Sequence, residues 1–257
     1  MSTKSVMEDW LLVALWGAEQ LGRGPWAMLN ASFETWERQH GLHRRLAELE
    51  RRELVRREKR AGQMVCALTE QGWLAALGGK NAPARWNRLW DGQWRQLLFD
   101  LPQHQRRARI RLWRWLRQKG FGYLQQSVWV CPDPVDELSV ALEDFRDDVE
   151  SLIVMDARCS AGYSDEAIVR GAWDFEEINR RQEAYLSTAT LSAAERKRFA
   201  ASPAELGAWL RTERIAWQHA LSLDPLLPRV LWPKRYRGET AWQARVELYR
   251  DIAACFQ

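Results

Sequence analysis

The chain has 257 residues, which allows one large domain or two to three small ones. Hydrophobic residues make up 46% of it, enough for a substantial core, and its 16 tryptophans suit buried cores and interfaces alike. The formal net charge is only +4. The apolar run Trp10–Trp16 is far too short to cross a bilayer, so we expect no membrane-spanning segment.

Four cysteines, Cys66, Cys131, Cys159 and Cys255, stand far apart in the sequence. They form no C-x-x-C pair and no Cys/His spacing typical of zinc, so we expect reduced, mostly buried thiols and no metal site. The first residues lack the basic-then-apolar pattern of a signal peptide. We therefore expect a cytoplasmic protein that does not contact a membrane.

Charge is distributed in bands along the chain. Glu37 to Arg60 has nine bases against five acids, a net of +4, and Arg85 to Lys119 has ten bases against two acids, a net of +8. Pro132 to Asp156 has nine acids against one base, a net of −8. Basic bands favour a polyanionic partner, and the acidic band favours pairing within or between subunits. A charge run is commonly a solvated face, so banding by itself supports nucleic-acid binding only weakly.

The first forty residues predict three helical stretches. Residues 6–21 place apolar side chains at close to helical spacing. Pro25 suits the first turn of a short helix over Trp26–Ala31, and a further stretch from Ser32 runs through Trp36.

A helix, a hairpin and a second helix are predicted over residues 42–77. The first helix is amphipathic and ends at Leu54-Val55, and a tight turn at Ala61-Gly62 joins two strands. Thr69 is expected to cap a helix that runs through Leu77. This order resembles a winged helix-turn-helix, in which a recognition helix enters the major groove of DNA.

Under this interpretation, the polar face of the first helix and the tip of the hairpin face DNA. Arginine pairs bidentately with guanine or holds phosphate, whereas contacts from the hairpin tip position the protein without specifying sequence. The alternative is an exposed, arginine-rich helix that is salt-bridged to Glu48 and Glu53. The predicted DNA-binding residues are His43, Arg44, Arg45, Arg51, Arg52, Lys59 and Arg60.

The segment Gly78–Pro83 is rich in residues that break regular structure, so it predicts a linker and a domain boundary. Residues 93–157 then predict a β-α-β-β-α-β unit in the ferredoxin-like order. Its strands are expected at Trp94–Leu101, Gly122–Gln125, Val128–Cys131 and Ser151–Met155, with helices at Gln103–Lys119 and from Pro134 through Val149. Asp133 is expected to cap the second of these helices.

The last hundred residues predict helices. They are expected at Ala172–Leu186, Leu191–Phe199, Ser202–Leu223 and Ala241–Phe256, with capping boxes at Ser192/Glu195 and Ser202/Glu205. The resulting fold class is α+β with three domains. They are an N-terminal winged helix-turn-helix domain at 1–80, a central ferredoxin-like βαββαβ dimerisation domain at 86–157, and an all-helical C-terminal domain at 158–257 that binds an effector or the dimer partner.

The chain contains no Walker loop, G-x-G-x-x-G, G-x-S-x-G or H-E-x-x-H pattern, so we expect no enzyme, no cofactor and no catalytic residue. Asp100 leaves one alternative open. It ends the first strand of the central unit, where a carboxylate paired across a dimer would hold a divalent metal for phosphodiester hydrolysis. We favour a turn-capping role ahead of Leu101-Pro102, because no second carboxylate or histidine accompanies it in the strand-helix turn.

Several short segments carry a resemblance to a known family. They are Trp90–Arg95, Leu98–Pro102, Lys119–Gly122, Ser127–Val130, Ala172–Asp174 and Asp224–Pro228. Through these segments the chain resembles the PaaX family of bacterial transcriptional repressors, and the resemblance covers nearly its whole length. The family order is a winged helix, a ferredoxin-like middle domain and a helical C-terminal domain.

The resemblance implies a homodimeric repressor that binds double-stranded DNA at an inverted-repeat operator. A two-fold dimer meets pseudo-palindromic half-sites. It also implies release by a small effector, which in the best-known members is an aryl-coenzyme A thioester. The middle domain of the family is similar in fold to a ferredoxin-like nuclease of CRISPR adaptation, which is the reason for weighing a metal-dependent nuclease centred on Asp100.

Two departures from the family pattern are visible, and two questions stay open. Arg52-Glu53 stand where a glycine is expected, which does not threaten the fold. The loop Trp232–Gly238 differs from the Trp-Pro-Gly of relatives, so the effector of the best-known members is not carried over. The partner of the arginines at 106–117 stays open, since they suit a ligand's phosphates, DNA or the acidic band at 132–156. Besides the effector-released repressor and the nuclease, a third hypothesis is a factor that binds DNA without any effector.

Overall fold

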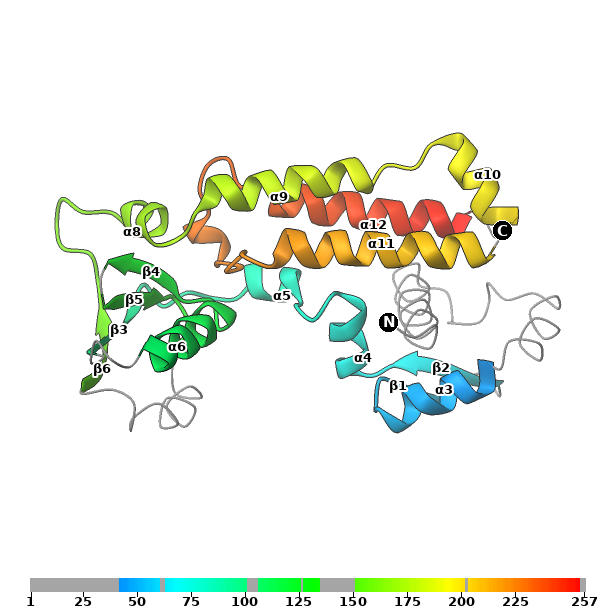
Figure 1. Cartoon of the computed structure of the whole chain (residues 1–257), viewed down its shortest axis with the longest axis horizontal. Coiled ribbons are helices and arrows are strands. Elements are labelled where there is room, and N and C mark those ends of the chain that lie inside the picture. The colour runs from blue at the N-terminus through cyan, green and yellow to red at the C-terminus, as the bar shows by residue number, and fades with distance from the viewer. Residues whose placement is uncertain are drawn as a thin grey trace. The chain divides into compact units, whose positions relative to one another are not determined.

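The computed structural model describes residues 42–60, 63–100, 106–125, 127–134, 151–201 and 203–254 (Figure 1). The helical stretches predicted ahead of residue 42, the Ala61-Gly62 turn and the amphipathic helix predicted between 134 and 149 lie outside these residues. No helix in the described part of the chain is both long enough and apolar enough to cross a membrane.

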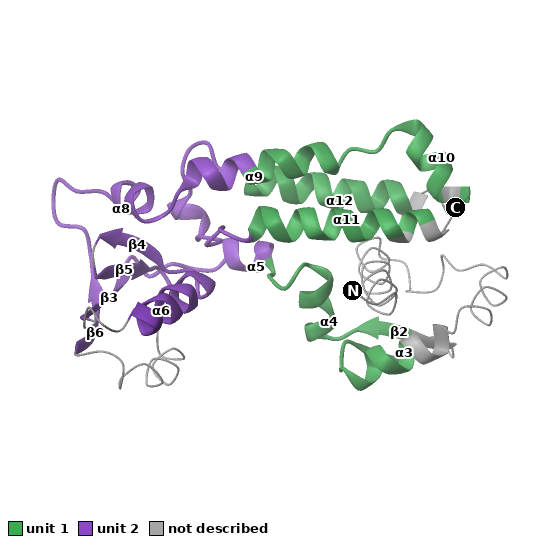
Figure 2. Cartoon of the chain, in the orientation of Figure 1, with its two compact units in different colours: residues 1–81, 181–221, 237–257 green, residues 82–180, 222–236 purple. Residues whose placement is uncertain are grey.

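The chain divides into two compact units (Figure 2). The first unit comprises residues 1–81, 181–221 and 237–257, and the second comprises 82–180 and 222–236. The division at Asn81 falls inside the predicted linker. Residues 158–257, predicted as one helical domain, are shared between the two units.

The first unit begins with the predicted helix, hairpin and helix. They are α3 (Leu42–Arg51), β1 (Val55–Arg60), β2 (Gln63–Leu68) and α4 (Glu70–Ala76), and the two strands pair antiparallel with Val55 opposite Leu68. Thr69 is the N-cap of α4, since its Oγ1 accepts a hydrogen bond from Gly72 N at 3.0 Å. These elements confirm the local prediction because helical spacing, strand composition and the cap all act over short distances.

The end of α3 turns into β1 without the expected glycine. Glu53 has a φ of 57°, in the left-handed region. Leu54 N donates to Leu49 O and Glu53 N donates to Glu50 O, both at 2.9 Å, which is the Schellman arrangement. A non-glycine residue in this conformation costs about 1–2 kcal/mol. The hydrogen bonds and the buried pair Leu49 and Leu54 offset that cost.

The first unit also contains three helices that lie side by side (Figure 1). They are α9 (Phe175–Thr188), α11 (Pro203–Leu221) and α12 (Gly238–Ala254), of which α9 begins in the second unit. Trp217 is fully buried and lies 5.0 Å from the ring of Tyr185 and 5.8 Å from that of Trp242. These aromatic contacts link the three helices.

α10 (Ala193–Ala201) begins with the predicted capping box. Ser192 Oγ accepts from Glu195 N at 3.2 Å, and Glu195 Oε2 accepts from Ser192 N at 2.9 Å. This reciprocal pair satisfies two backbone donors at the helix start. Ser202, predicted to cap α11, lies outside the described residues.

The helix predicted over 172–186 is confirmed from Phe175 onward as α9, but it starts three residues later than predicted. The structure has α8 (Asp165–Ala172) and then α9, with Trp173 extended between them at φ −132° and ψ 141°. Asp174 then starts α9, since its Oδ1 accepts from Glu177 N at 3.0 Å. The chain breaks there because the Trp173 side chain packs into the core of the second unit, and helical periodicity in the sequence does not reveal that contact. The last helix begins at Gly238, three residues earlier than predicted.

The second unit is built on a four-stranded antiparallel sheet in the order β4-β5-β3-β6. Its described elements are β3 (Trp94–Asp100), α6 (Arg106–Gln118), β4 (Gly122–Gln125), β5 (Val128–Cys131) and β6 (Ser151–Ala157). This is the strand order of a β-α-β-β-α-β unit with a split β-α-β. Gly120, at a φ of 88°, ends α6 and turns the chain into β4.

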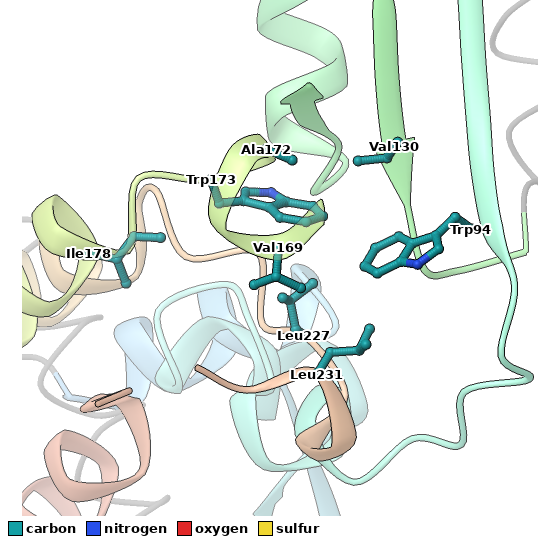
Figure 3. Packing of buried hydrophobic residues seen from close by; sticks show 8 residues of the cluster. All are labelled: Trp94, Val130, Val169, Ala172, Trp173, Ile178, Leu227 and Leu231. Carbon is teal, nitrogen blue, oxygen red and sulfur yellow. The ribbon is translucent and has the colours of Figure 1, made fainter. Parts of the chain in front are cut away.

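The two faces of this sheet are covered by different elements. On one face, Leu112 and Leu116 of α6 pack on Leu97, Phe99 and Trp129. Side chains alternate along a strand, so Trp94 and Val130 point to the other face. There they meet Val169 and Ala172 of α8, Trp173, Ile178, and Leu227 and Leu231 from the chain's last third (Figure 3).

Candidate functional site

The second unit contains a pocket of about 1180 Å³, within a factor of two of typical small-molecule sites. Its lining comes from the end of α6, the start of β4, α8, the first turn of α9 and the segment 222–235 around the short helix η2 (Arg229–Leu231). Three stretches that are distant in sequence, 117–123, 165–179 and 222–235, therefore form one concave surface. Such convergence is the usual geometry of a ligand site.

Aromatic side chains form one wall of the pocket. Trp173, Phe175 and Trp232 all line it. The indole of Trp232 donates from Nε1 to Leu227 O at 2.9 Å, and the Phe175 ring meets Tyr236 edge-on at 5.9 Å. These contacts fix the aromatic groups in place before any ligand binds, which lowers the entropy cost of binding.

Gly122 explains how Trp173 reaches this wall. A Cβ on Gly122 would lie 2.5 Å from the Trp173 ring and 2.7 Å from Ala172 Cβ. Only a residue without a side chain allows the indole to lie against β4. Gly122 belongs to the Lys119–Gly122 segment, so the packing gives a physical reason for the glycine in that pattern.

The rim of the pocket is charged. Exposed cations are contributed by Arg117, Arg170, Lys234 and Arg235, and carboxylates by Asp165, Glu166, Asp174 and Glu176. Two of these carboxylates already have structural partners. Asp165 accepts from Trp94 Nε1 at 2.7 Å, and Asp174 caps α9. Four exposed cations and the exposed carboxylates of Glu166 and Glu176 then remain beside the aromatic wall, and the cations suit an anionic ligand with an apolar or aromatic part.

A group of ion pairs holds the 222–236 segment in place. Asp133 accepts from Arg85 Nη2 at 2.6 Å and from Arg88, and Arg88 also donates to Leu226 O. Burial lowers the pKa of Arg88, against the opposing effect of Asp133. Asp133 was predicted to cap a helix that lies outside the described residues. In the structure its carboxylate pairs with two arginines.

The segment is fixed from a second side by Asp224. Its Oδ1 accepts from Leu226 N at 2.8 Å, and its Oδ2 accepts from the Tyr236 hydroxyl at 2.6 Å. Tyr236 in turn accepts from Trp86 Nε1 at 3.0 Å. Leu226 is held at a φ of 51°, so the Asp224–Pro228 segment is a fixed turn and not merely a helix break.

The predicted DNA-binding residues lie on α3 and β1, except Arg52, which is in the turn between them. Arg51 and Arg52 are exposed, and Arg51 Nη2 pairs with Glu48 Oε1 at 2.6 Å, as the salt-bridged alternative expected. The side chains of the other five predicted residues lie outside the described ones. Arg56 and Arg57 on β1 are also exposed and pair with Glu58 and Glu50, and the sequence analysis did not single them out.

Asp100 is exposed at the end of β3, opposite Ser151 of β6. Within the described ranges, no group of three or more His, Cys, Asp or Glu side chains is placed to hold a metal ion. The metal-dependent nuclease is therefore not supported.

A buried polar cluster lies among the helices of the first unit. It consists of Tyr185, Glu213, Arg245 and Tyr249. Arg245 Nε pairs with Glu213 Oε1 at 2.8 Å, and both side chains are fully buried. The Tyr185 and Tyr249 hydroxyls each donate to Glu213 at 2.6 Å. This cluster was not predicted from the sequence. Its one visible signal was a glutamate on the apolar face of α11, four residues before Trp217, which indicates a buried carboxylate.

The buried polar cluster also reaches the end of α4. Arg245 Nη2 donates to Ala76 O at 3.4 Å, and Trp217 Nε1 donates to Leu77 O at 2.9 Å. Lys80 Nζ donates to Leu221 O at 3.0 Å. The first two bonds satisfy carbonyls at the end of α4, and the third satisfies the last carbonyl of α11. Together they attach the hairpin region, which comprises β1, β2 and α4, to α11 and α12 within the first unit.

Two family models match the chain. The PaaX protein central Cas2-like domain matches residues 87–169, and the PaaX-like protein C-terminal domain matches residues 173–255. The chain belongs to the PaaX family. The pocket draws its lining from both PaaX domains, with Arg117 and Val169 in the central one and Trp173 and Trp232 in the C-terminal one.

Among solved structures, the chain is similar to uncharacterized protein Rv0674 from Mycobacterium tuberculosis. The two are 21% identical with a TM-score of 0.49, over 84% of this chain and 82% of the other. None of the curated proteins compared with the chain matches it.

Proposed function

We propose that this PaaX-family protein is a sequence-specific transcriptional repressor that binds an inverted-repeat operator as a homodimer and is released by a small effector. The match of both PaaX domains carries this proposal, because these domains are consistent with a transcriptional regulator. The elements from α3 to α4 precede those domains in the order of a winged helix-turn-helix, which is a DNA-binding unit.

The sheet of the second unit supports a homodimer. β6 is an edge strand, and Ile153, Val154 and Met155 on it are 51%, 38% and 42% exposed. An edge strand with exposed apolar side chains is a common pairing surface.

The molecular mass measured by analytical ultracentrifugation tests the homodimer. A mass of two chains supports it, and a mass of one chain at micromolar concentration contradicts it.

Replacing Arg44 and Arg45 by alanine is expected to weaken operator binding by at least tenfold. Each arginine that contacts a base edge contributes about 1–3 kcal/mol. The measurement is fluorescence anisotropy with a duplex from upstream of the protein's own operon, at physiological salt. Gln71→Ala, exposed on α4, is the control. Equal affinity of the double variant and the native protein means that α3 is not the recognition helix.

The pocket is the proposed effector site, and an acyl-coenzyme A thioester fits its chemistry. The aromatic wall of Trp173, Phe175 and Trp232 suits the acyl group, and the exposed cations suit the phosphates. Binding of such a ligand to the native state raises the free energy of unfolding, by about 2.7 kcal/mol at a concentration of 100 times Kd.

A thermal-shift series with aryl- and alkyl-coenzyme A thioesters is expected to include at least one stabilising ligand. Arg170→Gln/Lys234→Gln removes two exposed rim cations and is expected to weaken that ligand about tenfold, because each loses a charge-assisted contact to phosphate. The matched control is Lys197→Gln/Arg250→Gln, which removes two exposed cations outside the pocket. If no thioester shifts the melting temperature, the effector-free hypothesis stands instead.

A further inference from the structure

α6 presents a continuous basic face to solvent. Its sequence, RRARIRLWRWLRQ, contains no acid. Arg107, Arg111 and Arg114 follow one another at steps of four and three, so they share one side of the helix, and all three are exposed. The opposite side is buried through Leu112 and Leu116. At 1.5 Å per residue the three arginines extend over roughly 10 Å.

The two outer arginines of this face lack an acidic partner among the described residues. Neither Arg107 nor Arg114 forms an ion pair with a side chain in the described ranges. Exposed guanidinium groups gain favourable electrostatic energy when a polyanion covers them.

The pocket does not account for these three residues. Arg117 is the α6 residue that lines it, whereas Arg107, Arg111 and Arg114 lie outside its lining. A ligand's phosphates held in the pocket therefore do not contact the outer arginines, Arg107 and Arg114. An extended anion is the partner that matches several exposed guanidinium groups along one helix side.

We propose that the Arg107–Arg111–Arg114 face of α6 contacts the sugar-phosphate backbone of double-stranded DNA. DNA carries one negative charge per about 1.7 Å of axis, a density that a row of arginines complements, and arginine binds phosphate bidentately. Such contacts add affinity at any sequence and leave base recognition to other residues. The inference rests on the proposed function, and it gives the central domain a direct part in holding the operator.

The test compares native protein with Arg107→Gln/Arg114→Gln by fluorescence anisotropy, on operator and unrelated duplexes, between 50 and 300 mM KCl. Losing two phosphate contacts lowers the slope of log K against log salt by about 2 and weakens binding roughly tenfold at 150 mM. Both duplexes are expected to lose the same factor. Lys197→Gln/Arg250→Gln, an equal loss of charge on exposed residues of α10 and α12, is expected to keep the native slope.

The outcomes separate this inference from the proposed function. If Arg107→Gln/Arg114→Gln keeps the native operator affinity and the native slope of log K against log salt, the inference is wrong and the proposed repressor function is unaffected. A lower melting temperature with unchanged DNA affinity also overturns it, since the arginines then pair with acids of the same chain. If the native protein binds both duplexes equally and the variant still has a reduced salt slope, the proposed repressor function is wrong and the α6 contact with DNA stands. Native protein that binds neither duplex overturns both.

Discussion

Replacing Arg245 by methionine is expected to lower the free energy of unfolding by about 3–5 kcal/mol. Arg245 is fully buried in α12, where it pairs with the equally buried Glu213 of α11. Removing the guanidinium leaves the carboxylate without its charge partner, held only by the hydroxyls of Tyr185 and Tyr249. Burial and the nearby Glu213 charge raise the pKa of both tyrosines, so both hydroxyls stay protonated and keep donating to the carboxylate, but as neutral groups they do not balance its charge.

The measurement is urea denaturation at pH 7, followed by tryptophan fluorescence. Arg250→Met, an exposed position on the same helix, is the control and is expected to change stability by less than about 0.5 kcal/mol. Adding Glu213→Leu to Arg245→Met is expected to restore much of the loss, because a buried ion pair replaced by apolar groups is commonly near neutral. A single variant within 1 kcal/mol of native contradicts the importance of the pair.

The Gly72→Ala variant is expected to destabilise the hairpin region by about 2–3 kcal/mol. A Cβ at this position in α4 would lie 1.8 Å from Leu54 O and 2.8 Å from Leu54 C. Both are backbone atoms, and Leu54 O already accepts from Thr69 N at 3.1 Å. Because neither atom can rotate away, α4 must separate from the start of β1.

Hydrogen exchange of residues 54–76 measures this effect, since it reports local opening in the hairpin region separately from the rest of the chain. Gln71→Ala, the preceding exposed position on α4, is expected to keep native protection. Operator affinity is expected to fall with the loss of protection in Gly72→Ala. Native protection factors in Gly72→Ala would mean that α4 and β1 approach each other less closely than the structure has them.

Local signals made much of the fold predictable. The β1–β2 hairpin, the Thr69 cap, the Ser192/Glu195 box and the strands β4 and β5 follow from spacing and capping residues that act within a few positions. The exact start of α9 was not predictable, because Ala172 and Trp173 also fit the helical pattern. The Trp173 indole instead packs against Gly122 and the core of the second unit, contacts that are distant in sequence.

The candidate sites show the same limit. The pocket was missed because its wall combines residues as distant as Tyr123 and Trp232, and no spacing in a sequence encodes that proximity. The Asp133 ion pairs depend in the same way on Arg85 and Arg88, 45 or more residues earlier. By contrast, the basic face of α6 was visible as a charge band, and the structure adds which arginines share the exposed side.

The return of residues 222–236 to the second unit affects how this protein is made. The core that contains Trp94 and Val130 also needs Leu227 and Leu231, which leave the ribosome about a hundred residues or more later. Synthesis proceeds at about 5–20 residues per second, so the apolar face of β3 and β5 stays uncovered for on the order of ten seconds. The nascent chain therefore exposes indole and valine surface throughout that interval, and chaperone binding during synthesis is expected to concentrate there.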